Sequence, residues 1–358
     1  MQETAPQEGT TWRERGIALG LFLATAGTVF LSYGWQWLGR MPWSDAAAAR
    51  DCALYAAGLM SILLAHEMGH YVVARRHQIE RSLPYFIPFP MALGTLGAVI
   101  RLRSLPRDRN GLLEMGAAGP IAGFVVAIAV MALGLSGTVE HARPELVLEA
   151  WPLPALPPMA AAEPSLWDPL LRLLGASDPT ESIQLTILAN PLLMDLIGEL
   201  MLGHAPGRYA QLSPLAMAGW AGCFLTGMNL IPIGQLDGGH ILNALWPRIA
   251  PTVSKIGTVV VIAGGVLWTG WAVWGFLLWQ FGATRGIPMT EGGAVSSRAR
   301  LSFAVCVVAF ALSFMVRPIV IDTLTFSEID VRTEAGVVID PLAYQRWLRG
   351  EETPEATP

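Results

Sequence analysis

The run His66-Glu67-Met68-Gly69-His70 carries two imidazoles and a carboxylate inside an apolar stretch of the chain. Side chains four residues apart share one face of a helix, so His66 and His70 can aim their rings at one metal ion, with Glu67 beside it. Ionisable groups at membrane depth are costly unless a partner, a metal or a wet cavity offsets their desolvation. The run therefore indicates a functional site.

Two histidines supply only two ligands, whereas a catalytic zinc ion usually takes three protein ligands and one water. The best candidate for the third is Asp237, which lies in the run NLIPIGQLDGGH at residues 229–240. We expect Pro232 to let the backbone turn inward, and the glycines after Asp237 to remove side-chain bulk near the metal. The alternative interpretation is a turn aspartate followed by two glycines.

The composition indicates that the elements which position these groups are membrane-spanning helices. Of the 358 residues, 53% are hydrophobic and 14% are charged, against about 25% charged in an ordinary soluble domain. A transmembrane helix needs about 20 apolar residues. Stretches that approach or exceed that length cover residues 16–38, 46–74, 112–135, 214–231, 256–279 and 301–321. The sequence predicts an all-α polytopic membrane protein with about six transmembrane helices.

The distribution of arginines sets the expected orientation. Residues 75–109 hold seven arginines, whereas residues 140–208 hold three arginines and nine acidic residues. The positive-inside rule places the first segment in the cytoplasm. The second span then exits to the cytoplasm, the third returns and the fourth exits again, so His70 and Asp237 can meet. Arg285, Arg298 and Arg300 fit this scheme if segment 256–279 bends back, and not if it crosses once.

Residues 84–102 are apolar but contain three prolines and two glycines, which exclude a continuous helix. We expect a short membrane-embedded β-like segment near residues 94–102, covered by protein or lining a cavity. As an edge strand it could pair with an extended substrate. The alternative is a hairpin that only packs on neighbouring helices. The residues expected to bind substrate are Gly94, Thr95, Leu96, Gly97, Ala98 and Val99.

The expected organisation has a membrane core between shorter terminal parts. Residues 183–202 are apolar but interrupted by polar residues, which favours a docked amphipathic helix. No internal repeat or added soluble domain is recognisable. The predicted parts are a polar N-terminal tail (1–15), a first transmembrane helix (16–45), a catalytic membrane core (46–250) with an extracytoplasmic Pro-rich excursion (139–213), C-terminal transmembrane helices (251–325) and a polar C-terminal tail (326–358).

Other polar residues give weaker signals. His77 is too far along the helix from His66 to bind the same ion, since eleven residues rise about 16 Å, and we expect it at the membrane surface. His240 could support the third ligand or be an ordinary loop histidine. Glu114 suits the start of a helix. The net charge of −5 gives no reason to propose a nucleic-acid partner.

In combination, these motifs resemble those of the site-2 proteases, a family of polytopic intramembrane zinc metalloproteases. The resemblance covers residues 50 to 250, and its details are most similar to plastid-type and bacterial members. The chain shows neither the PDZ nor the CBS domain that some relatives carry. The matching motifs are HEMGH at 66–70, GAAGP at 116–120, and Asn229 followed by LDGG at 236–239.

The resemblance implies one Zn²⁺ per chain, held by His66, His70 and Asp237. Glu67 would be the general base, and Asn229 would position substrate or stabilise the oxyanion. The implied activity is hydrolysis of peptide bonds in transmembrane or membrane-proximal segments of proteins. The alternatives are a catalytically inert binding or chaperone relative and a metal-dependent transporter, for which inverted repeats would be expected.

The expected location is a bacterial cytoplasmic membrane, with the active site near the cytoplasmic side. The first span is too long for a signal-peptide core, and no Ser-rich, acidic-poor transit peptide precedes it. The expected partners are a transmembrane protein substrate and the lipid bilayer. The sequence does not specify an oligomeric state.

Overall fold

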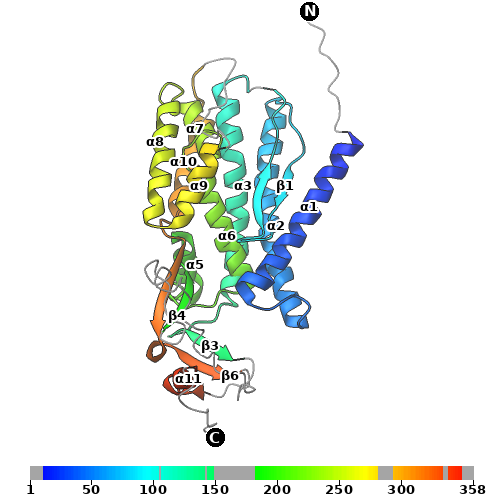
Figure 1. Cartoon of the computed structure of the whole chain (residues 1–358). Coiled ribbons are helices and arrows are strands. Elements are labelled where there is room, and N and C mark those ends of the chain that lie inside the picture. The colour runs from blue at the N-terminus through cyan, green and yellow to red at the C-terminus, as the bar shows by residue number, and fades with distance from the viewer. Residues whose placement is uncertain are drawn as a thin grey trace, which may run out of the picture. The chain divides into compact units, whose positions relative to one another are not determined.

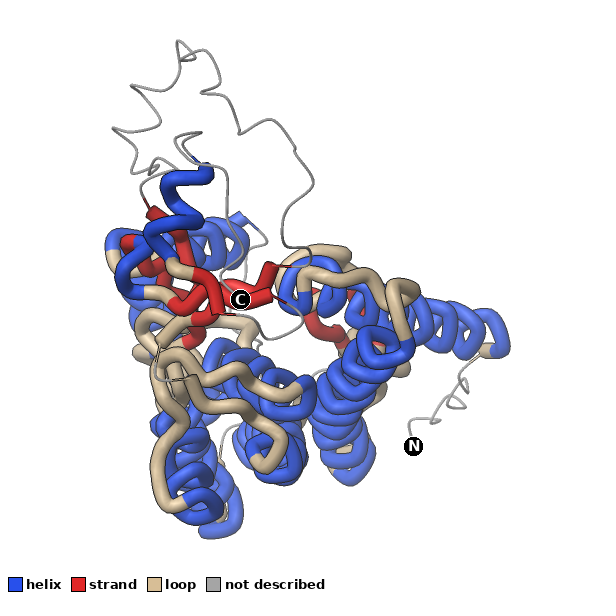
Figure 2. Tube along the Cα trace, turned by 90° about the horizontal axis from the view of Figure 1, so that it is seen from below, coloured by secondary structure: helices blue, strands red, loops and turns tan. Residues whose placement is uncertain are grey.

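The computed structural model describes residues 11–104, 106–141, 143–148, 182–280, 293–333 and 338–348. The chain divides into two compact units. The first comprises residues 1–138, 190–206 and 212–318, and the second comprises residues 139–189, 207–211 and 319–358. Helices predominate, and the strands are short (Figures 1 and 2).

The first unit is built mainly from helices. Three of them are long and apolar enough to cross a membrane: residues 12–38, α2 and α3. At 1.5 Å per residue, the 16 residues of α6 and the 17 of α10 fall short of the roughly 30 Å hydrocarbon core. The helices are α1 (Trp12–Ser32), the π-helical turn η1 (Tyr33–Leu38), α2 (Ala46–Arg76), α3 (Arg109–Leu135), α5 (Leu192–Leu202), α6 (Pro214–Asn229), α7 (Asp237–Leu245), α8 (Ala250–Ala263), the 3₁₀ turn η2 (Gly264–Val266), α9 (Thr269–Gln280) and α10 (Ser297–Ser313).

Helix α3 is the central element of this unit and packs against α2, α6, α7 and α10 (Figure 1). Glycines permit the close approach. A Cβ at Gly134 would overlap the backbone of Ala216, and one at Gly219 would lie 2.6 Å from the Cβ of Met131. Helix backbones packed this closely have little freedom to shift, so α3 provides a rigid support for its neighbours.

Side-chain caps fix where these helices begin. The Asp45 carboxylate accepts a hydrogen bond from the Ala48 amide at 2.8 Å, which also holds the pKa of that carboxyl below its usual range. Asp108 caps α3 in the same way through the Gly111 amide, at 2.7 Å. Each cap satisfies an amide that the first helical turn leaves without a partner.

Two strands, β1 (Tyr85–Pro88) and β2 (Thr95–Val99), form an antiparallel hairpin in the first unit. Tyr85 pairs with Val99, and the register shifts before Pro88. Strand β2 falls within the segment expected to be β-like. Helix α1 packs on β1.

Segment 256–279 does not form one helix, because α8 and α9 are separated by η2 and fold back on each other. Gly264 lies beside Trp271 and Gly275 beside Ile262, which is the pattern of an antiparallel pair. Of the two alternatives, the segment therefore bends back. The Asn110 side chain then bonds to the backbone at Ala294 and Ser296, which places the start of α10 beside the start of α3.

The second unit contains the remaining strands. Strand β3 pairs in parallel with β6, which pairs antiparallel with β7, and β4 pairs antiparallel with β5. Its core comprises Leu324, Phe326, Ile329, Val331 and Ile339. The elements are β3 (Glu145–Leu148), β4 (Ser182–Leu188), β5 (Ile319–Thr325), the 3₁₀ turn η3 (Phe326–Glu328), β6 (Asp330–Thr333), β7 (Val338–Ile339) and α11 (Pro341–Leu348).

The positions of these strands correct three expectations. The last apolar stretch does not run as a helix to residue 321: α10 ends at Ser313, and the β-branched run after Pro318 forms β5. Residues 183–202 split into β4 and α5 around Asn190-Pro191, because proline cannot continue either element. Residues 326–358 are not simply a tail, since they supply β6, β7 and α11. The chain is thus mostly helical rather than all-α.

Parts of the expected Pro-rich excursion (residues 149–181), the N-terminal tail (1–10) and Arg285 lie outside the described residues.

Candidate metal centre

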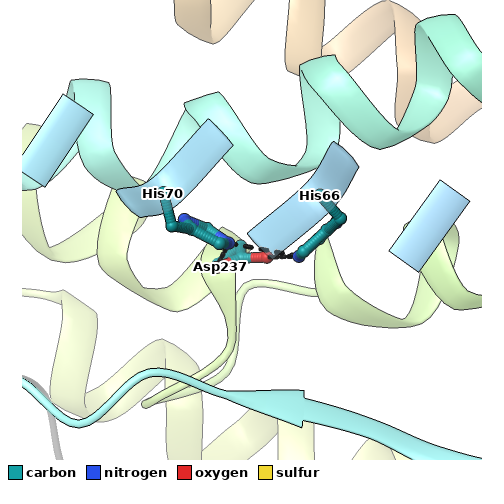
Figure 3. A group of neighbouring side chains, drawn as sticks. All are labelled: His66, His70 and Asp237. Atoms are coloured by element: carbon teal, nitrogen blue, oxygen red, sulfur yellow. Dashed lines mark hydrogen bonds and ion pairs between the residues drawn. The ribbon is translucent and has the colours of Figure 1, made fainter. Parts of the chain in front are cut away.

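His66 and His70 on α2 meet Asp237, the first residue of α7 (Figure 3). The Nε2 atoms of the two histidines are 3.1 Å apart. One carboxylate oxygen of Asp237 lies 3.2 Å from His66 Nε2, and the other lies 3.3 Å from His70 Nε2. Three potential ligands from two segments about 170 residues apart in sequence therefore converge, with one donor atom from each lying within 4.8 Å of the others.

The spacing and chemistry of these donors fit a zinc ion. Tetrahedral coordination with bonds of about 2.0–2.1 Å requires ligand atoms about 3.3 Å apart. The two Nε2 atoms, 3.1 Å apart, and the 3.2 and 3.3 Å from each of them to its nearer Asp237 oxygen are close to that separation. His70 Nδ1 lies 2.8 Å from the carbonyl oxygen of Met115, which can only accept a hydrogen bond. The proton therefore sits on Nδ1, and the Nε2 lone pair is free to bind metal.

Glycines on α3 make room for the two histidine rings. A Cβ at Gly119 would overlap the His70 ring, and one at Gly123 would lie 3.1 Å from the Cβ of His66. Gly116 lets α7 approach α3 closely in the same way, because a Cβ at residue 116 would lie 3.0 Å from the Cβ of His240. The GAAGP run is thus the surface on which α2 and α7 assemble the site.

The glycines after Asp237 have a different role from the one expected. A Cβ at Gly238 would overlap the Leu230 carbonyl, and a Cβ at Gly239 would overlap that of Gly234. These two glycines let α7 pack on the turn that follows α6, rather than clearing space at the metal. That packing sets where Asp237 begins its helix.

Glu67 is buried, with 6% of its surface exposed, and lines the same cavity as the three ligand candidates. The cavity has a volume of about 620 Å³. Asn229, the last residue of α6, also lines it. The structure therefore brings the carboxylate and the amide singled out in the sequence to the space beside the ligands.

Five of the six residues expected to bind substrate divide into two groups, and Gly97 belongs to neither. Leu96, Ala98 and Val99 line the cavity. Gly94 instead packs against the Val29 backbone with a φ of +88°, and the buried Thr95 hydroxyl donates to the Ile87 carbonyl at 3.0 Å. A Cβ at Gly97 would meet no atom within 4 Å. One group therefore faces the site, and Gly94 and Thr95 hold the hairpin in place.

The weaker candidates acquire definite positions. His240 is a buried residue of α7 that lines the cavity, not a loop histidine. His77 is not merely a membrane-surface residue, because its Nε2 lies 3.1 Å from Glu114 Oε2. Arg298 Nε lies 3.6 Å from the other Glu114 oxygen, which ties the start of α10 to α3.

Several residues that line the cavity were not among the site residues expected from the sequence. They are Arg101, Gln235 and Trp274 among others. Gln235 directly precedes the LDGG run, and Arg101 directly follows the β-like stretch, so proximity to a motif was the available signal. Trp274 had no such signal, because it reaches the cavity only through the fold-back of α9.

Comparison with known proteins gives a consistent assignment. The family model described as "Peptidase family M50" matches residues 54–269. The "Probable zinc metalloprotease EGY1, chloroplastic" of Arabidopsis thaliana is 28% identical over 298 residues, which cover 76% of this chain and 48% of that protein. The "Probable zinc metalloprotease EGY2, chloroplastic" of the same plant is 28% identical over 253 residues, covering 70% and 39%. The chain thus spans less than half the length of these relatives.

Among solved structures, the "Site-2 Protease from Methanocaldococcus jannaschii" aligns with 81% of this chain and 86% of its own, at 14% identity and a TM-score of 0.31. A TM-score this low does not establish a shared fold.

Proposed function

Because the chain belongs to peptidase family M50, the site-2 protease family, we propose that it is a zinc-dependent endopeptidase that cleaves transmembrane or membrane-proximal segments of other proteins. The observation that carries this proposal is the meeting of His66, His70 and Asp237 within 3.1 to 3.3 Å, beside Glu67 in one cavity. Two imidazoles and a carboxylate leave a fourth position for water or substrate, as catalytic zinc sites do.

His66, His70 and Asp237 would hold one Zn²⁺ per chain. A zinc ion bound there supplies a Lewis acid for the scissile carbonyl and makes water more acidic. The Glu67 carboxylate accepts the proton of the attacking water and delivers it to the leaving amine nitrogen. Its position one residue after His66 keeps this proton transfer within the same cavity.

The Asn229 side chain supplies the second polar group of the reaction. Its amide N–H donates to the carbonyl oxygen of the scissile bond as negative charge develops there. Support comes from its place at the end of α6, where it lines the cavity and precedes the turn that leads to Asp237.

An extended substrate would bind along β2. A helical substrate hides its amides, so it must unwind before its carbonyl can reach the site. Strand β2 has β1 as its only strand partner among the described residues, and Leu96, Ala98 and Val99 line the cavity. The other edge of β2 can therefore pair with an extended segment, as in other complexes formed by strand addition.

The proposed location is a bacterial cytoplasmic membrane, and the arginines support a site on the cytoplasmic side of this multi-pass protein. The arginine-rich segment between α2 and α3 ends where α3 begins, and the fold-back of α8 and α9 returns Arg298 to that end. All these cations then lie on one side of the bilayer, as the positive-inside rule requires.

The alternatives explain the site less well. A metal transporter has no use for Glu67 inside the cavity, and an inert relative would be free to lose it.

The test is cleavage of a single-span protein by the purified chain in liposomes. We expect chelation of the metal to abolish cleavage and added Zn²⁺ to restore it, whereas cleavage that survives complete metal removal would overturn the proposal.

A further inference from the structure

Arg101 lines the cavity from the side of the β hairpin. It follows β2 by two residues and is an exposed residue. No other arginine and no lysine lines this cavity in the part of the chain that the structure describes. Its position next to the strand proposed to bind substrate makes it a candidate for a residue that determines substrate specificity.

Three other arginines of the same segment are engaged elsewhere. Arg81 stacks on the Tyr71 ring at 4.1 Å and donates to the Ile79 carbonyl. Arg103 pairs with Glu14, and Arg109 donates to the carbonyls that end α7. The Arg101 guanidinium, in contrast, forms no hydrogen bond or ion pair with the described residues.

The backbone of Arg101 is nevertheless held firmly. Its amide donates to the Ser82 hydroxyl at 3.0 Å, and its carbonyl accepts from the Ser82 amide at 2.9 Å. Ser82 is itself buried. Because the backbone is already fixed, only the side chain has to be ordered when a ligand binds, which lowers the entropy cost of binding.

We propose that Arg101 selects substrates with an acidic side chain at the end of the extended segment that passes Val99. This inference rests on the proposed function. A guanidinium presents a planar fork of donors that matches a carboxylate and binds it through two hydrogen bonds. At the rise of a strand, about 3.4 Å per residue, Arg101 lies about 7 Å beyond Val99. An acidic side chain of the substrate can therefore contact Arg101 only from a narrow range of positions along the substrate.

Binding can be measured without cleavage by using the Glu67→Gln variant in neutral-lipid nanodiscs. The probe is a fluorescent single-span peptide of Leu and Ala with a central Gly pair, in which one Glu or Gln is moved stepwise from the centre toward the cytoplasmic end. We expect one position at which Glu binds about 10-fold more tightly than Gln, a factor typical of a charge-assisted contact.

Substitution of Arg101 should remove this preference. With Arg101→Gln, Glu and Gln peptides should bind equally, and with Arg101→Glu a Lys peptide should become the preferred one at the same position. Arg76→Gln removes an exposed charge in the last turn of α2, outside the cavity, and should leave the preference intact. Unchanged zinc content and thermal unfolding of the Arg101 variants would show that they fold.

Two results would overturn the inference: a Glu preference that persists in Arg101→Gln, or an effect of Arg101 that follows the anionic lipid content and not the peptide. The latter would make Arg101 a lipid-phosphate contact. Failure of the proposed function looks different. In that case the native chain cleaves none of the peptides, although Arg101 still decides which of them bind.

Discussion

The His70 imidazole packs so closely on Gly119 that a Cβ at residue 119 would overlap the ring. The contact joins the helix that carries two ligand candidates to the central helix of the first unit. The same α3 segment offers the Met115 carbonyl that fixes the proton on His70 Nδ1. The orientation of the His70 ring therefore depends on a glycine that has no side chain to bind metal or substrate.

Gly119→Ala should reduce zinc affinity at least about 10-fold, since changes around a metal ligand commonly cost that much. The added methyl must rotate the His70 ring or push α2 from α3. Zinc content after dialysis against a weak chelator measures the effect. The control is Gly20→Ala in α1, where a Cβ would meet no atom within 4 Å and zinc binding should not change. Native zinc affinity in Gly119→Ala would contradict the described packing.

Asp237→Ala should remove bound zinc and cleavage together, with His66 and His70 intact. Two histidines alone leave a catalytic zinc site one protein ligand short. Metal analysis of the purified variant, beside an activity assay, provides the measurement. Undiminished zinc content and activity would exclude Asp237 from the site.

The hairpin that carries β2 is tied to the first helix by polar contacts. The Thr28 hydroxyl donates to the Gly94 carbonyl at 2.7 Å, and the Ser32 hydroxyl donates to the Ala92 carbonyl at 3.0 Å. The double variant Thr28→Val, Ser32→Ala should raise KM by up to about 30-fold while zinc content stays native, because each lost hydrogen bond costs about 1 kcal/mol and every 1.4 kcal/mol is about tenfold.

The matched control for this double variant is Thr25→Val, one turn earlier on α1. The Thr25 hydroxyl is buried and has no hydrogen-bond partner among the described residues, so its removal should leave KM unchanged. A native KM in the double variant would show that α1 does not position the hairpin.

The fold-back of α8 and α9 predicts which ends of the first unit share a side of the membrane. Single cysteines at Arg103 and Ala294 should react with an impermeant thiol reagent from the cytoplasm, and one at Ser136 from the opposite side. The three native cysteines are buried and should react slowly. Labelling of Ala294→Cys from the same side as Ser136→Cys would contradict the proposed topology.

The proximity of the ligand candidates was predictable from the sequence because it depends on local rules. Helical periodicity puts His66 and His70 on one face, and the direction of successive spans brings Asp237 to them. Non-helical backbone at residues 94–102 was predictable for a similar reason, since prolines and glycines exclude a helix there, whereas which of its side chains line the cavity was not.

What the sequence did not reveal depends on contacts between distant segments. Strand β5 lies in the same apolar stretch of sequence as helix α10, but it pairs with β4, more than 130 residues earlier. The run after Pro318 is rich in β-branched residues, as strands are, but its partner lies beside a Pro-rich stretch without periodicity. Trp274 likewise reaches the cavity only because α9 turns back at Gly264 and Gly265.

The most direct test of the central claim is mass spectrometry of a single-span protein incubated in liposomes with native chain or with Glu67→Gln. We predict that the native chain yields two fragments whose new termini lie within or next to the span. We predict that Glu67→Gln retains zinc and leaves the substrate intact, because the proton acceptor is lost and the metal ligands are not. Cleavage at the same bond and at a native rate by zinc-loaded Glu67→Gln would contradict the proposed mechanism.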